Sequence, residues 1–131
     1  MTTGSGPGTG SGPGYWADTA AEAVRELNHA TLAGTGLDSP ADVYTVLGAL
    51  ASLVSRLPQA LAQLQAFLDT ECEAGQLAVV DGEYLADPVA AITASAHWLE
   101  HAAAAADSAS RALEQAQQTL TWVASSRCPQ P

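Results

Sequence analysis

The stretch VYTVLGALASLVSRLPQALAQLQAFL, residues 43–68, decides the fold. Its large aliphatic residues recur at alternating intervals of four and three, which places them along one side of an α-helix. A second apolar row repeats every seventh residue beside the first, so the apolar face is wider than a two-stranded coiled coil requires. The first row consists of Val43, Leu47, Leu50, Val54, Leu57, Leu61, Leu64 and Leu68, and the second of Val46, Leu53, Ala60 and Phe67.

The residues around this stretch predict a helix over 40–73. Ser39 is a good N-cap, and Pro40 is tolerated in the first turn because no backbone N–H is needed there. Pro58 lies inside the pattern and interrupts helical hydrogen bonding. Because the apolar rows continue in phase across Pro58, we expect a kink in one helix, with two helices that meet at residues 57–58 as the alternative.

Two further helices are predicted, one on each side. The segment 15–33 carries an apolar stripe at helical spacing and ends before Gly34. The segment 88–125 starts at Asp87-Pro88, and its middle, HAAAAADSAS at 101–110, is small enough for a partner helix to approach closely. Its predicted inner rows are Ile92, Leu99, Ala106, Leu113 and Leu120, with Ser95, Ala102, Ala109, Ala116 and Val123 beside them.

These segments predict an all-α fold in which helices 40–73 and 88–125 form a long antiparallel hairpin. Together with the shorter N-terminal helix, this is a three-helix, bundle-like arrangement with coiled-coil-type packing. We expect one helical domain over 15–126, a flexible tail of Gly, Ser, Pro and Thr over 1–14, and a short C-terminal tail over 127–131. Between the two long helices, VVDGEY at 79–84 allows either a small β-hairpin or an ordered loop.

Charge and composition limit the classes of partner. The chain has a formal net charge of −10, four arginines and no lysine, which disfavours nucleic acid and anionic membrane surfaces. The longest apolar run is about twelve residues, against roughly 20 for a membrane span, and no signal peptide pattern opens the chain. Cys72 and Cys128 would lie at opposite ends of the hairpin, which predicts free thiols and a cytoplasmic setting.

One motif invites a catalytic interpretation. HWLEH at 97–101 fits H-x-x-E-H, the pattern of inverted zinc peptidases. In the predicted helix both histidines face outward, and the only downstream glutamate, Glu114, is about 20 Å away along the same helix. We therefore predict no metal site, no cofactor and no catalytic residue, and the chain is not expected to be an enzyme.

The wide leucine-rich face instead predicts a protein-interaction, assembly or regulatory module. We expect a homodimer or a helical protein partner, no nucleic acid and no membrane; Leu61→Glu should split the dimer and Gln63→Glu should not. A secreted effector or chaperone-like partner is the alternative function, and a metal-dependent hydrolase is a distant third. The predicted interaction face comprises Val46, Leu50, Leu53, Val54, Leu57, Leu61, Leu64, Phe67 and Leu68.

Two resemblances bear on this expectation. The runs AVRELNHATLAG, DVYTVLGALASLVSRLPQALAQL and DPVAAITASAHWLEHAAAAADSASRALEQAQ resemble small all-helical proteins of high-GC actinobacteria, some from mobile genetic elements. This resemblance implies a helical fold and a bacterial cytosolic setting, and supplies no site residues. The chain is also similar in length to the helical hairpins secreted by type VII systems. It departs from their pattern because the inter-helix loop has no Trp-x-Gly, and Tyr15 and Tyr84 are followed four residues later by Thr19 and Pro88.

Overall fold

The computed structural model describes residues 11–126 and confirms the all-α fold. These residues form helices joined by turns and loops, with no strand among them. The described residues divide between Ser39 and Pro40 into two compact units, 11–39 and 40–126, and each is described by itself. The elements are α1 (Pro13–Ala30), the 3-10 helix η2 (Leu32–Gly34), α2 (Pro40–Ser55), α3 (Leu57–Glu73) and α4 (Pro88–Thr119).

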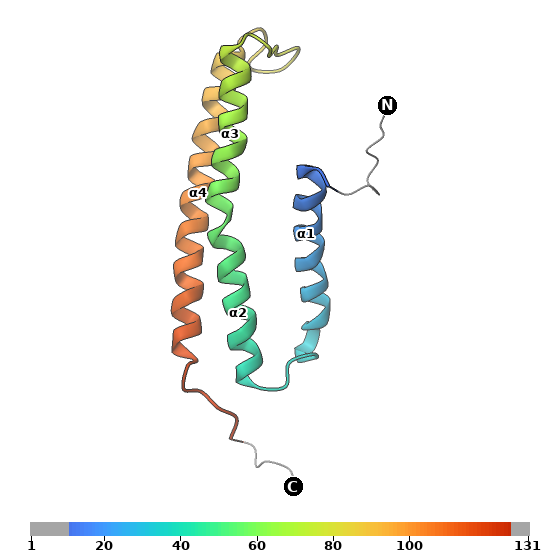
Figure 1. The fold of residues 1–131 in the computed structure, drawn as a ribbon, viewed down its shortest axis with the longest axis vertical. Coiled ribbons are helices and arrows are strands. Elements are labelled where there is room, and N and C mark those ends of the chain that lie inside the picture. Colours follow the sequence, from blue (N-terminus) through green and yellow to red (C-terminus); the bar gives the residue numbers. More distant parts are fainter. Residues whose placement is uncertain (1–10, 127–131) are drawn as a thin grey trace. The chain divides into compact units, whose positions relative to one another are not determined.

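The N-terminal unit is helix α1 followed by one short 3-10 turn (Figure 1). Helix α1 starts two residues earlier than predicted because Pro13 fits its first turn. It ends at Ala30, three residues before the predicted end, where Thr31 donates both its N–H and its hydroxyl to the Leu27 carbonyl. Gly36 then takes a positive φ of 82°, and a side chain there would collide with the Ala30 carbonyl oxygen.

The predicted helix over 40–73 is interrupted at Arg56, between α2 and α3. The interruption precedes Pro58, which has no backbone N–H to donate. The Arg56 N–H donates to the Leu53 carbonyl, three residues back, instead of completing a regular α-helical turn. The two helices nevertheless continue in the same direction along α4, as Figure 1 shows. The break at Arg56 therefore separates α2 from α3, but both helices still pack against α4.

Helix α4 begins as predicted and ends early. Asp87 Oδ1 accepts a hydrogen bond of 3.1 Å from the Ala90 N–H, and Pro88 follows in the first turn. The helix ends at Thr119, so the prediction of 125 is wrong by six residues. Beyond Thr119 the backbone turns through bonds between residues three apart, in a run with β-branched and aromatic side chains that favour helix weakly.

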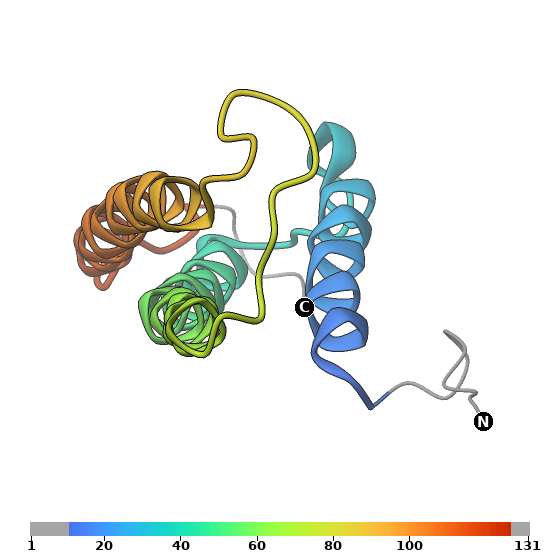
Figure 2. The same cartoon turned by 90° about the horizontal axis from the view of Figure 1, so that it is seen from above.

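Helices α2 and α3 pack against α4 to form the predicted antiparallel hairpin (Figures 1 and 2). Of the described residues only Ala51, Ala106 and Ser110 are buried, so small side chains form the centre of the hairpin. Of the second row predicted for α4, Ala102, Ala109, Ala116 and Val123 are exposed. The prediction of that row is wrong because α4 instead turns its other neighbouring row inward: Ala96, Ala103, Ser110 and Gln117.

The connection over 75–87 is an ordered loop and not a β-hairpin. The Ala86 N–H donates to the Val79 carbonyl over 3.1 Å, which closes the loop at its base. At its tip, Asp81 Oδ1 accepts from the Gly82 N–H over 2.7 Å, and Gly82 adopts a φ of 90°. A single backbone bond across the loop does not make a ladder, so the Asp-Gly turn forms without flanking strands.

Candidate interaction surface

The contact between α2 and α4 is close because both helices present small residues. Ser110 Oγ donates to the Ala51 carbonyl over 3.4 Å, and Gln117 Nε2 donates to the Tyr44 carbonyl over 3.1 Å. Both acceptors are backbone atoms of α2, which a side chain of α4 reaches only when the helices approach closely. Gly48 allows this approach, since a Cβ there would lie 2.5 Å from Gln117 Nε2.

This close contact determines where the leucine-rich face points. An α-helix turns about 100° per residue, so the side of α2 that carries Gly48 and Ala51 is rotated well away from the row containing Leu50 and Leu57. Helix α4 therefore covers the edge of the apolar face and leaves its middle open along α3. Leu57, Leu64 and Phe67 keep 42%, 55% and 62% of their surface exposed. We call Leu57, Ala60, Leu64 and Phe67 the α3 row.

The nine residues of the predicted interaction face separate into two groups. Leu57, Leu64 and Phe67 are exposed, whereas the other six are half-buried. Leu61 borders a hollow together with Leu99 of α4, so a glutamate at position 61 would disturb the hairpin itself. Gln63 lies seven residues after Arg56 on the same side of the helix, next to the α3 row. The pair Leu61→Glu and Gln63→Glu is therefore the wrong test for a dimer.

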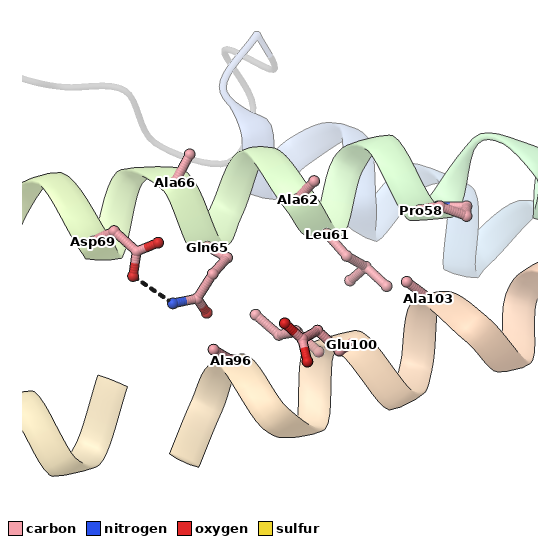
Figure 3. Close-up of a pocket in the computed structure, with 10 residues that line it drawn as sticks. Pro58, Leu61, Ala62, Gln65, Ala66, Asp69, Ala96, Glu100 and Ala103 are labelled. Carbon is pink, nitrogen blue, oxygen red and sulfur yellow. Dashed lines mark hydrogen bonds between the residues drawn. The ribbon is translucent and has the colours of Figure 1, made fainter. Parts of the chain in front are cut away.

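A hollow of about 260 Å³ opens between α3 and α4 (Figure 3). Alanines, Leu61 and Leu99 form most of its wall, and Gln65, Asp69 and Glu100 are its polar members. Gln65 Nε2 donates to Asp69 Oδ1 over 2.8 Å, whereas Gln65 Oε1 is buried without a hydrogen-bond partner. The hollow is thus an apolar gap left by alanines, with polar groups mainly from one helix.

The H-x-x-E-H motif lies on α4, where its histidines are exposed. The rings of His97 and His101 have centroids 4.5 Å apart, and Trp98 packs edge-on against His97 with centroids 5.1 Å apart. Glu100 lies on another side of the helix, at the hollow beside α3. Within residues 11–126, no group of three or more His, Cys, Asp or Glu side chains is arranged to hold a metal ion.

We expect that zinc does not contribute to stability. Replacing both His97 and His101 with alanine should change the free energy of unfolding by less than about 0.5 kcal/mol, because both side chains are exposed and on a helix surface. Thermal unfolding of wild type and variant, each with and without a chelator, measures this. A structural zinc ion would reveal itself by a loss of several kcal/mol in the variant and by a chelator-sensitive wild type.

Of the two cysteines that were predicted to carry free thiols, one lies among the described residues. Cys72 carries a free thiol near the end of α3, and Cys128 lies outside the described residues.

By length and composition alone, the segment Pro40–Glu73 is long and apolar enough to cross a membrane. That segment includes Arg56 near its middle, and 6% of the apolar window is buried, whereas the core helices of soluble proteins that meet the same test are mostly buried.

Trp98 is an exposed aromatic residue that the sequence pattern did not single out. It keeps 68% of its surface exposed. Trp98 directly precedes Leu99 on α4, just as Ala60 of the α3 row directly precedes Leu61 on α3. Leu99 and Leu61 face each other, and because α3 and α4 are antiparallel, the residues one position before them point to the same side of the hairpin. Trp98 therefore flanks the α3 row. A search for large residues one position before each inward leucine would have found it.

Comparison of the chain with models of known protein families, with curated proteins and with solved structures finds no significant match.

Proposed function

We propose that this chain is a non-enzymatic interaction module that binds an amphipathic helix along the α3 row. The observation that carries the proposal is the exposure of Leu57, Leu64 and Phe67 on one side of α3. Their spacing, with Ala60 between them, alternates three and four residues, which is the spacing that a partner helix fills. No charged residue occurs over positions 57–68, so a helix can dock there without burying an unpaired charge.

The energetics support a partner. Covering a large aliphatic or aromatic side chain contributes about 1.5–3 kcal/mol when the whole side chain is buried, and roughly half of that for residues already half-covered. Three such side chains and Trp98 therefore supply several kcal/mol, enough to offset part of the entropy lost on association. Within the described chain, by contrast, the buried set contains only two alanines and a serine.

A photo-crosslinking amino acid at position 67 tests this proposal in cells that make the protein. We expect crosslinks to protein from position 67 of the otherwise unchanged chain. Position 115 on α4, where Gln115 is exposed, is the matched control and should give none. Equal crosslinking from both positions, or none from either, contradicts the proposal. Recovery of the chain in the membrane fraction, crosslinked to lipid at position 67, would instead assign the apolar segment Pro40–Glu73 to a bilayer.

A further inference from the structure

We infer that the helix bound by the α3 row is the α3 helix of a second copy of this chain, in antiparallel orientation. The inference rests on the proposed function and names its partner. Charged residues are distributed unevenly along α3 and directly before it. Residues 57–68 are uncharged, Arg56 directly precedes them, and Asp69, Glu71 and Glu73 follow them.

Two of these charges lie beside the α3 row. At about 100° per residue, Glu71 points within the sector occupied by Leu57, Leu64 and Phe67, and Arg56 points about 20° from Phe67. Among the described residues, Arg56 forms no ion pair within its own chain. Asp69 and Glu73 point toward other sides of α3 and are not part of this surface. The α3 row is thus flanked by one cation, Arg56, at its start and by one anion, Glu71, at its end.

An antiparallel second copy matches this row in both shape and charge. When the two α3 helices cross at about residue 62, Leu57 of one copy lies beside Phe67 of the other, and Ala60 lies beside Leu64. Arg56 then lies within about one helical turn of Glu71 of the second copy, a distance that an arginine side chain spans. A twofold axis repeats the same pair on the other side. A parallel copy would instead place Arg56 beside Arg56 and Glu71 beside Glu71.

The size of the surface indicates a reversible dimer. The contact from Arg56 to Glu71 is about 22 Å long at 1.5 Å per residue. Trp98 widens it on the α4 side. A contact of this length belongs at the small end of the range of interfaces, where reversible complexes are found, and we expect a dissociation constant on the order of micromolar.

Charge reversal on the full chain tests the inference. We compare wild type, Arg56→Glu, Glu71→Arg and an equimolar mixture of the two variants by light scattering behind a sizing column and by sedimentation velocity at tens of micromolar. Wild type should dimerise. Each variant alone should lose at least about tenfold in affinity, because like charges then occupy positions 56 and 71 at both contacts between the copies. The mixture should dimerise again, since a pair made of one copy of each variant has opposite charges at both of these contacts.

Arg111→Glu is the matched control, because it changes the net charge by the same amount as Arg56→Glu at an exposed site on α4. It should leave the wild-type dimer unchanged. Arg56→Gln is a milder variant in case charge reversal lowers helicity, which circular dichroism reports, and it should weaken the dimer less than Arg56→Glu does. Wild type that stays monomeric, variants that dimerise as well as wild type, or a mixture no stronger than its components would each overturn the inference.

These outcomes also separate the inference from the proposed function. A monomeric wild type whose position 67 crosslinks to a different protein rejects the second copy and leaves the interaction module supported. A crosslinked product of twice the chain mass supports both. Absence of dimer together with absence of any crosslink rejects both.

Discussion

Replacing Ala106 with leucine is expected to lower the free energy of unfolding by about 2–3 kcal/mol. Ala106 is one of three described residues that are buried, and by helical spacing it lies on the side of α4 that carries Ser110 and Gln117. Three added carbon atoms have no space there, so the helices must separate or the leucine must adopt a strained rotamer. Because small domains are stable by only about 5–15 kcal/mol, this is a large share of the total.

Urea denaturation followed by circular dichroism measures the effect, and Ala105→Leu is the control. Ala105 is the preceding residue on the same helix and is exposed, so the same substitution there should change the free energy by less than about 0.5 kcal/mol. Equal effects at the two positions would mean that α4 does not pack through its alanine and serine face. An effect only at position 105 would require the helix to be rotated by about 100°.

Replacing Gly48 with leucine is expected to lower the free energy of unfolding by about 2 kcal/mol. A glycine inside a helix ordinarily costs about 1 kcal/mol relative to alanine, so its presence in α2 needs a compensating reason. That reason is Gln117, whose Nε2 would lie 2.5 Å from a Cβ at position 48. The Gln117 side chain would have to leave the Tyr44 carbonyl, to which it donates over 3.1 Å.

A double-mutant cycle with Gly48→Ala and Gln117→Ala isolates this contact. In the wild-type background, Gly48→Ala should give no stabilisation, because the gain in helix propensity is offset by displacing Gln117. In the Gln117→Ala background, the same change should stabilise the hairpin by up to about 1 kcal/mol. The two substitutions should therefore be non-additive by about 1 kcal/mol. Additive effects would show that Gly48 and Gln117 are independent.

The sequence by itself determined the all-α fold, the hairpin and the start of two of its helices. Apolar spacing of three and four residues depends only on helix geometry, and Pro40 and Asp87-Pro88 act within the first turn, through atoms a few residues apart. Pro58 likewise marked the interruption between α2 and α3 to within two residues. The residues that act in these cases are close together in the chain, so a short stretch of sequence is enough to predict the result. The helix end at Thr119 was missed because no glycine or proline follows closely to mark it.

Only the tertiary structure decided which side of α4 faces its neighbours and which leucines stay exposed. Helix α4 is rich in alanine on several sides, so burying one small row instead of another changes the apolar area little. The choice came from contacts between residues far apart in the chain: Ser110 and Gln117 reach backbone carbonyls of α2, and Gly48 leaves room for them. Hydrogen bonds of this kind exist only once two helix backbones are close. The same rotation leaves Leu57, Leu64 and Phe67 uncovered, which no pattern along a single helix could specify.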